Sequence, residues 1–432
     1  MEQKQEGLKR ELTVVDVAVT VINISISSGI FLLPALIASK LGNASIVAYV
    51  LCGIMFLLVT LCFAEVGSRI TTSGGAYAYI EKAFGKCVGF IANAIFWFGV
   101  GVMVAAALIN AIADMLSIYF PIFNNPWWRG AFFFILIVFF AIIHIRGVKQ
   151  GMITVKIITM IKIVPLILLI IVGLFHLNIQ NLNWQGFPTL GSLGEASLIL
   201  FFAFIGGENV LNISGEMKNP QKTGPLGLMI GVVIIIIFYS LIQIIAQSTL
   251  GAELDDQKAP LAAVATLLLG DWGTMLLIMC GMIAIFGSLN SLVMVFPRVM
   301  FAGAQDGLLP KFLSKVHPKY ATPHWSIITL LVIGFILAVS GGFKQLLVLA
   351  TLSMLLLYVG VVLAAIKFRW KSDSKYKAGF LLPGGYSIPV ITLIILFWLI
   401  MQSKSNEIIG IGLFILALAI IYGIGLYFKR QI

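Results

Sequence analysis

Long apolar segments recur along the whole chain, and they constrain its fold more than any other feature of the sequence. A run of about 17 or more apolar residues can cross the hydrocarbon core of a bilayer as a helix. The 432 residues contain twelve such segments, near 14–38, 44–67, 88–118, 128–145, 152–175, 194–214, 226–249, 271–302, 325–340, 345–366, 386–402 and 407–428. The longest polar loops are expected at 68–86, 176–192, 250–270, 303–324 and 367–385. We predict an all-α integral membrane protein, with twelve transmembrane helices in a single domain over residues 1–432.

Basic residues are distributed unevenly between the predicted loops. Charged residues make up only 10% of the chain, whereas a soluble domain usually has about 25%. Loops on the side of the N-terminus carry twenty Lys and Arg residues, and loops on the opposite side carry five. By the positive-inside rule both termini are cytoplasmic, including the tail at residues 1–13. This asymmetry explains the net charge of +11 without a nucleic acid partner. We expect the plasma membrane as the location.

Residues that could hold a metal or perform enzyme chemistry are scattered. The four cysteines have no CxxC spacing, and neither an HExxH pair nor a nucleotide-binding loop occurs. We expect no metal site, no cofactor and no enzymatic activity. A membrane-embedded enzyme or a channel is an alternative class without a sequence feature behind it.

The first apolar segment is interrupted in its middle by Ser27-Ser28-Gly29-Ile30-Phe31. Lipid offers no hydrogen bonds, so a polar break at this depth is costly unless the backbone opens there for a purpose. Free N–H groups at the start of a half-helix can hold a carboxylate. A second break is expected at Ile205-Gly206-Gly207-Glu208. Two broken helices in corresponding positions predict a transporter with its substrate site at the bilayer midplane.

The positions of the two breaks also predict an internal repeat. They fall in the first and sixth segments, which leaves five helices in each unit. An odd number of spans reverses orientation, so residues 194–366 would form an inverted copy of residues 14–175. The helices within 386–428 would be additions outside the repeat.

Of the charged residues inside predicted helices, Lys162 and Glu208 are the candidates for a functional role. Lys162 is half-way along its segment, where an ammonium needs a partner or a wet cavity. Glu208 follows the second break, where a carboxyl is either protonated by desolvation or faces a polar cavity. Each residue is either a structural hydrogen-bonding group or a group that couples transport to an ion.

Five stretches in order resemble motifs of the amino acid–polyamine–organocation superfamily, amino acid permease branch, from about Leu12 to at least Pro323. They are Ser28-Gly29-Ile30-Phe31 with Leu33-Pro34-Ala35; Ala64-Glu65-Val66-Gly67-Ser68-Arg69; Ser73-Gly74-Gly75-Ala76-Tyr77-Ala78-Tyr79 with Ala83-Phe84-Gly85; Phe204-Ile205-Gly206-Gly207-Glu208 with Glu216-Met217-Lys218-Asn219-Pro220; and Gly287-Ser288-Leu289 with Ala304-Gln305-Asp306-Gly307-Leu308-Leu309-Pro310. Thr71 departs from the pattern, because many members have proline near this position.

The resemblance implies a leucine-transporter-type fold of five plus five helices and a substrate with an α-amino and an α-carboxyl group. In such proteins the first break holds the carboxylate, which here indicates Ser28, Gly29 and Ile30. Carbonyl oxygens of both broken helices hold the ammonium, which indicates Ser25, Phe202 and Ile205. Phe202 also matches an aromatic residue that gates the substrate in relatives, although simple packing would equally explain a phenylalanine here.

The resemblance also bears on coupling. Lys162 aligns with a lysine of sodium-independent relatives, in which the ammonium occupies the space of a sodium ion. Glu208 matches an acidic position of proton-responsive members. We therefore expect proton-coupled, sodium-independent transport by alternating access, with obligate amino acid exchange as the alternative.

A rough alignment brings Met103 or Val104, and Leu292, toward the side chain of the substrate. Apolar residues there favour a neutral L-amino acid, whereas a carrier of cationic amino acids or polyamines would need acids, amides or aromatic residues. That carrier remains an alternative. The expected partners are the amino acid, protons and the lipid bilayer, for a monomer or a homodimer.

Overall fold

The computed structural model describes residues 12–70, 75–117, 120–146, 152–183, 186–305, 309–320, 322–370 and 379–430. Side chains at 152–156, 158, 212–213, 215–216, 302 and 425–430 lie outside this description. Thr71, Ser73, Gly74 and residues 306–308 of the recognised motifs therefore lie outside the described residues, as does the side chain of Glu216.

Helices account for nearly all regular structure in the described ranges. The α-helices are α1 (Val14–Ser25), α2 (Ser28–Leu41), α3 (Ser45–Arg69), α4 (Gly75–Phe84), α5 (Lys86–Ala94), α6 (Met103–Leu116), α7 (Pro126–Arg146), α8 (Met152–Phe175), α9 (Leu190–Phe204), α10 (Pro220–Leu250), α11 (Pro260–Leu269), α12 (Asp271–Gln305), α13 (His324–Ser340), α14 (Phe343–Trp370), α15 (Ser387–Met401) and α16 (Ser405–Arg430). A π-helix, η2 (Ile95–Val102), joins α5 to α6, and a 3-10 helix, η5 (Gly207–Glu216), follows α9. The other 3-10 helices are η1 (Gly42–Ala44), η3 (Pro121–Asn124), η4 (Ile179–Leu182), η6 (Gly251–Leu254) and η7 (Lys311–Ser314).

Eight helical segments of the described chain are long and apolar enough to cross a membrane: Ser28–Arg69, Lys86–Leu116, Pro126–Arg146, Leu190–Leu211, Pro220–Leu254, Asp271–Gln305, Phe343–Trp370 and Ser405–Ile424. Shorter apolar helices cover Val14–Ser25, Thr159–Phe175, Pro260–Leu269, His324–Ser340 and Ser387–Met401. The chain is therefore an all-helical, multi-pass membrane protein.

Two of the predicted polar loops contain helices, which corrects the sequence-based expectation. The loop at 68–86 contains α4, and the loop at 250–270 contains α11. Each of these helices has 10 residues. Because both are much shorter than a membrane span, a search for long apolar segments could not find them.

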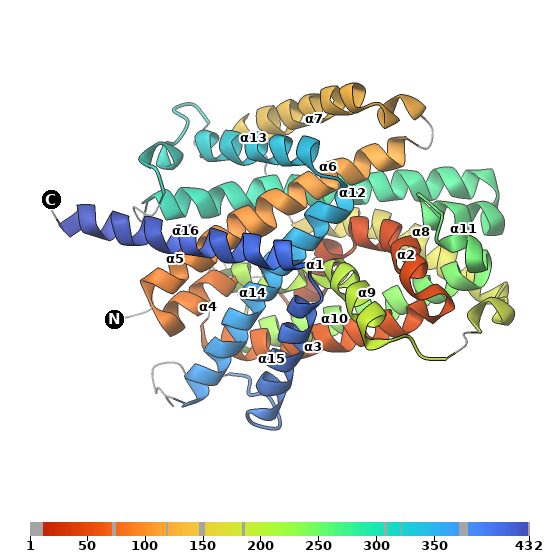
Figure 1. Cartoon of the computed structure of the whole chain (residues 1–432), viewed down its shortest axis with the longest axis horizontal. Helices are drawn as coiled ribbons and strands as arrows, with labels where there is room; N and C mark the ends of the chain where they lie inside the picture. Colours follow the sequence, from red (N-terminus) through yellow and green to blue (C-terminus); the bar gives the residue numbers. More distant parts are fainter. Residues whose placement is uncertain are drawn as a thin grey trace.

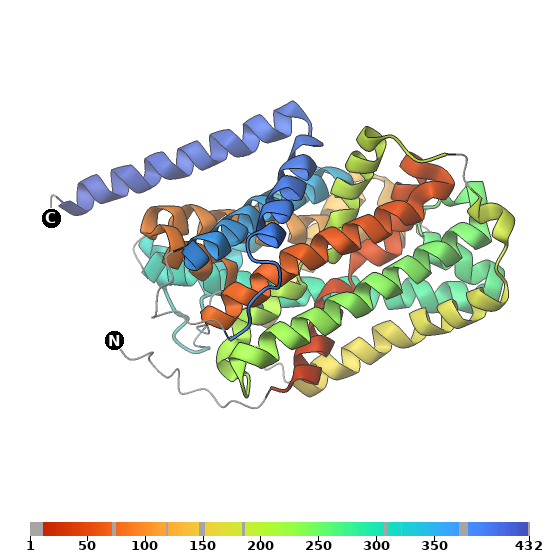
Figure 2. The same cartoon turned by 90° about the horizontal axis from the view of Figure 1, so that it is seen from below.

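The helices form a bundle in which the broken segments lie inside (Figure 1). The two long helices α3 and α10 pack together, α1 lies against α10, and α2 lies against α9. Local sequence fixes where the first segment begins, because Thr13 and Asp16 form a capping box at the start of α1. In contrast, α16 projects away from the bundle (Figure 2). Only 6% of the residues in its apolar, membrane-length stretch are buried.

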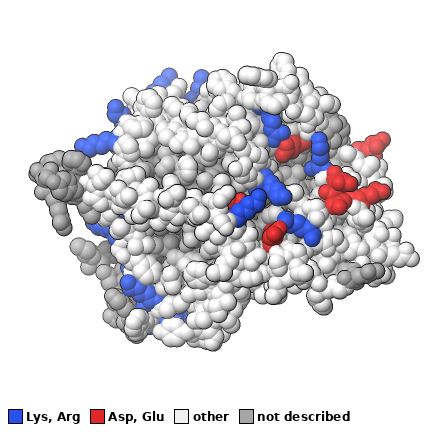
Figure 3. All heavy atoms as spheres, in the orientation of Figure 1, with Lys and Arg blue, Asp and Glu red and all other residues white. Residues whose placement is uncertain are grey.

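Charge is sparse on the face drawn in Figure 3. Basic side chains without acidic neighbours lie toward its left edge, whereas the acidic side chains gather in its centre and right half. A largely uncharged surface agrees with a lipid environment for most of this face.

Candidate functional site

Both predicted breaks are present, and they lie against each other. The first α-helical segment stops at Ser25 and resumes at Ser28. The sixth predicted segment is α-helical as far as Phe204, at the end of α9. It then passes through Gly206, which has a left-handed φ of 116°, and continues as η5. This backbone conformation strongly favours glycine.

Glycines let the two broken helices approach closely. A Cβ on Gly29 would lie 2.8 Å from the Cβ and 2.9 Å from the Cα of Ala203. On the other side of the breaks, a Cβ on Gly207 would lie 2.8 Å from the side chain of Val21. A parallel bridge between Leu12 and Met217 joins the same two segments beyond α1 and η5. The two breaks therefore form one packed crossing.

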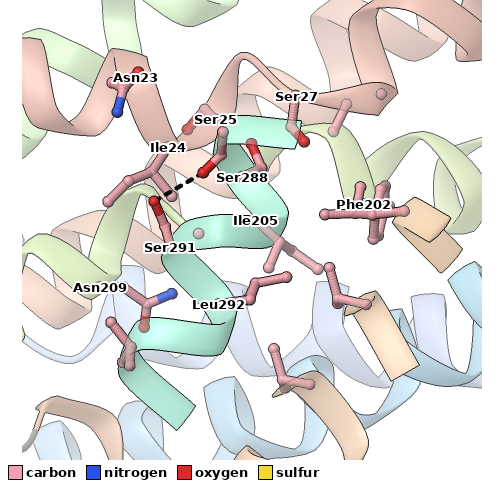
Figure 4. Close-up of a pocket in the computed structure, with 18 of the residues that line it drawn as sticks. Asn23, Ile24, Ser25, Ser27, Phe202, Ile205, Asn209, Ser288, Ser291 and Leu292 are labelled. Carbon is pink, nitrogen blue, oxygen red and sulfur yellow. Dashed lines mark hydrogen bonds between the residues drawn. The ribbon is translucent and has the colours of Figure 1, made fainter. Parts of the chain in front are cut away.

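A cavity of about 140 Å³ lies at this crossing, bordered by α1, α2, η2, α6, α8, α9, η5 and α12 (Figure 4). Figure 4 shows its two sides. Hydroxyl and amide groups gather on one side, and apolar side chains lie on the other. The polar lining residues are Asn23, Ser25, Ser27, Asn209, Ser288 and Ser291, and the apolar ones include Phe96, Val100, Val104, Leu108, Phe202, Ile205, Leu292 and Phe296.

Most of the residues predicted from sequence border this cavity: Ser25, Gly29, Val104, Lys162, Phe202, Ile205 and Leu292. Ser28, Ile30 and Glu208 are buried and are not among its lining residues. Met103, the alternative to Val104, borders a different cavity. The roles of all these residues in binding or coupling stay predictions.

Lys162 reaches from α8 to the first break. Its Nζ donates hydrogen bonds to the carbonyl oxygens of Asn23 and Ile26, at 3.2 and 3.3 Å. These carbonyls belong to the end of α1, where intrahelical partners run out. An ammonium is well suited to the negative end of a helix dipole. Lys162 therefore stabilises the broken end of α1, and it is the only charged residue among the described cavity-lining residues.

Tyr239 connects the two broken helices from α10, and sequence reasoning missed it. Its hydroxyl lies 2.7 Å from the carbonyl oxygen of Ser25 and 3.1 Å from that of Ala203. A hydroxyl has one proton to donate, so it satisfies one of these two carbonyls at a time. Nothing in the local sequence distinguishes Tyr239 from a packing residue, because its partners are backbone atoms of distant segments.

Glu208 holds the second break from within its own segment. Its Oε2 accepts a hydrogen bond of 3.0 Å from the backbone N–H of Gly206. The buried hydroxyl of Tyr358 from α14 lies close to the carboxyl of Glu208, and the two groups interact. Glu208 is only 3% exposed and is not among the residues that line the cavity.

Phe202 lies at the apolar side of the cavity and contacts α14. Its ring centroid is 6.3 Å from that of Phe343, in an edge-to-face arrangement at 89°.

Sequence reasoning also missed the polar wall formed by Ser288 and Ser291. Their spacing of three residues puts both on one face of α12, which is a signal that the sequence does carry.

Comparison of the sequence with known protein families gives a match over nearly the whole chain. The family described as amino acid permease matches residues 12–428. The chain belongs to the amino acid permease family. The family implies a small amino acid substrate and a membrane-embedded protein.

Several curated relatives align with this permease over most of their length. The serine/threonine exchanger SteT of Bacillus subtilis (strain 168) is 28% identical, over 96% of each chain. The branched-chain amino acid permease BcaP of the same strain is 27% identical, over 97% of this chain and 93% of the relative. The vacuolar cationic amino acid transporter 4 of Arabidopsis thaliana is 25% identical, over 84% of this chain and 64% of the relative.

Proposed function

We propose that this permease is a secondary active transporter that moves neutral L-amino acids across the plasma membrane by alternating access. The proposed architecture has twelve spans, a five-plus-five inverted repeat of residues 14–175 and 194–366, and cytoplasmic termini. The supporting observation is the cavity at the crossing of α1, α2, α9 and η5, where both helices are broken. Such breaks expose the backbone groups that bind both ends of an amino acid.

The carboxylate of the substrate is assigned to the start of α2. The first N–H groups of a helix lack intrahelical partners and carry the positive end of its dipole. Ser27 precedes α2 and makes no side-chain cap hydrogen bond to it. The amides of Ser28, Gly29 and Ile30 thus stand as donors for an anion, even where the side chains are buried.

The ammonium is assigned to carbonyl oxygens at the ends of α1 and α9, at Ser25, Phe202 and Ile205. The carbonyl of Ser25 already accepts from Tyr239. A carbonyl has two lone pairs, so the substrate and Tyr239 can share it.

The side chain of the substrate is assigned to the apolar wall formed by Val104, Phe202 and Leu292. No acidic residue is among the described residues that border the cavity, so a second cationic group would have no counter-charge. This favours neutral amino acids over the cationic or polyamine substrates that the sequence left as an alternative. Two relatives, named for serine and threonine and for branched-chain amino acids, support the same choice, whereas a third is named for cationic amino acids.

Coupling is assigned to protons through Glu208, without sodium. The ammonium of Lys162 already binds carbonyls at the end of α1, which are the kind of ligands that a sodium ion would need. An ionised carboxylate accepts a stronger hydrogen bond than a neutral carboxyl does. Protonation of Glu208 would therefore weaken its hold on Gly206 N–H and relax the second break.

Obligate exchange is the second candidate, and the similarity to a serine/threonine exchanger over 96% of both chains supports it. In that mode Glu208 would be a structural acceptor only. A monomer and a homodimer are both compatible with either mode.

Uptake of labelled neutral amino acids into proteoliposomes tests the proposal. Each amino acid is offered under an inward proton gradient, with and without unlabelled amino acid inside. We expect accumulation in empty vesicles that a protonophore abolishes and that does not need sodium. Uptake that requires a preloaded amino acid and ignores pH would establish exchange instead, and uptake of arginine or polyamines alone would contradict the neutral substrate.

The variant Leu292→Trp tests the assignment of the side-chain wall. We expect a shift toward smaller substrates, because the indole would fill the apolar side of a cavity of only about 140 Å³. Competition by unlabelled glycine, alanine, serine, leucine and phenylalanine measures the substrate profile. Leu363→Trp on the exposed side of α14 is the matched control. An unchanged profile in Leu292→Trp would remove Leu292 from the site.

A further inference from the structure

A second cavity has a volume of about 360 Å³. It is enclosed by α14, by α16, and by η2 together with the first residue of α6. It backs onto the proposed substrate cavity, because the π-helix η2 borders both. Phe96 and Val100 line the first cavity, whereas Phe98 and Gly99 line the second. The proposed transport function does not use this second cavity.

The lining of the second cavity changes from polar to apolar along its length. Gln345, Asn406 and Glu407 lie near the first residues of α14 and α16, so the polar groups gather at one end of these helices. Farther along α14 and α16 the lining is mostly apolar, at Leu349, Ile411 and Phe414, and Ile95, Phe98 and Met103 add to it. The exception is Ser353, whose hydroxyl donates a hydrogen bond to the carbonyl oxygen of Leu349. Glu407 is the only charged residue among the described residues that line the cavity.

The cavity exists because α16 is held to the bundle at only a few points. Phe414 contacts Phe98 with ring centroids 5.2 Å apart, and Tyr422 stacks on Phe90 at 5.4 Å. Outward-facing residues such as Ile409 and Leu413 are 59% and 61% exposed. Because α16 is apolar and long enough to cross a membrane, the gap beside it lies in the bilayer, where the molecules that can reach it are lipids.

We propose that this cavity binds one phospholipid whose headgroup carries an ammonium, with the ammonium at Glu407 and an acyl chain along Phe98, Leu349 and Ile411. The acyl chain packs against these apolar side chains by van der Waals contact, because a chain that comes from the bilayer is already out of water. Glu407 Oε2 already accepts the backbone N–H of Lys404 at 3.0 Å. A carboxylate has about four lone-pair sites, so it can accept from the ammonium as well. The same charge disfavours an anionic headgroup without an ammonium.

Native mass spectrometry of the purified full-length protein tests the site. The protein is incubated with an equimolar mixture of phosphatidylethanolamine and phosphatidylglycerol, and the retained lipid is counted. Gly410 borders the cavity, and a Cβ there would meet no atom within 4 Å. Gly410→Phe therefore adds a ring at the border of the cavity, at a position where the first side-chain atom has open space. Gly412 has equally open surroundings but does not border the cavity, so Gly412→Phe is the matched control.

We expect wild type and Gly412→Phe to retain one phosphatidylethanolamine and Gly410→Phe to lose it, with affinity lowered at least about tenfold, or ~1.4 kcal/mol. Equal retention in the two glycine variants would overturn the site.

Glu407→Gln tests the headgroup independently, and it serves if Gly410→Phe fails to fold. Glutamine keeps an acceptor oxygen for Lys404 N–H but removes the charge. We expect bound lipid to persist while the preference for phosphatidylethanolamine over phosphatidylglycerol disappears. An unchanged preference would overturn the assignment of the ammonium to Glu407.

Discussion

The two helix breaks at the centre of the permease are held by opposite chemistry. At the first break, donors from other helices bind carbonyl oxygens: Lys162 binds those of Asn23 and Ile26, and Tyr239 binds that of Ser25. At the second break, a carboxyl acceptor of the same segment, Glu208, binds the amide of Gly206. Each break leaves helical structure for two residues, but the chain resumes as the α-helix α2 after the first break and as the ten-residue 3-10 helix η5 after the second.

On this difference we propose that the first break is a scaffold and the second a switch. The hydrogen bonds at the first break depend on tertiary packing and tie three helices together. The hydrogen bond at the second break depends on the charge of a single carboxyl and spans two residues. We propose that a change of protonation acts mainly on the second break, which the hydroxyl of Tyr239 links to the first through the carbonyl oxygens of Ala203 and Ser25. Variants at each break test this separation.

Gly29→Val should have the largest effect. The crossing leaves no room for a side chain, since a Cβ would lie 2.9 Å from the Cα of Ala203. The valine would also cover the amides assigned to the carboxylate. We expect complete loss of uptake and binding in proteoliposomes. Gly334→Val in α13 is the control, because a Cβ there meets nothing within 4 Å. Retained affinity in Gly29→Val would contradict the site at the first break.

Lys162→Met should come next, because it leaves two buried carbonyls without their donor. An unsatisfied buried acceptor costs roughly 1–3 kcal/mol. We expect a lower unfolding temperature and loss of transport at every pH, as measured by thermal unfolding in detergent and by uptake. Lys258→Met, at an exposed loop position, should change neither. Normal stability with an altered ion dependence would instead make Lys162 a coupling residue rather than a scaffold.

Glu208→Gln should leave the fold intact and flatten the pH dependence. Glutamine retains an oxygen to accept from Gly206 N–H but cannot take up a proton. Wild-type uptake should rise as the external pH falls, because protonation relaxes the second break. Uptake by the variant should be constant over the same range. The exposed acid variant Glu253→Gln should keep the wild-type profile. A pH profile of Glu208→Gln identical to wild type would assign Glu208 to the scaffold.

Tyr239→Phe should have the smallest effect. It removes one donor that two carbonyls share and keeps the ring packed on Phe204 at 5.2 Å. A typical hydrogen bond contributes about 1 kcal/mol. We expect a modest rise in the KM for uptake with an unchanged pH profile. An effect as large as that of Lys162→Met would mean that Tyr239 contributes more to the stability of the first break than a single hydrogen bond can.

Prediction from sequence succeeded where local composition sets the structure. Both breaks were predicted, because serine and glycine inside an apolar run are visible without knowledge of the partners. The helices α4 and α11 were missed, because ten-residue helices resemble loops when the search is for membrane-length segments. Tyr239 and the serines of α12 were missed, because their importance depends on which distant backbone atoms they face.

The sequence by itself determined that the chain is a multi-pass helical membrane protein of the amino acid permease family, with broken first and sixth segments. Hydropathy and glycine placement act along the chain, so they can be read in one dimension. Only the tertiary structure decided that Gly29 packs on Ala203, that Lys162 and Tyr239 bind the end of α1, and that Glu208 is not among the residues that line the cavity. These contacts join residues far apart in the sequence, and they form only when the helices pack.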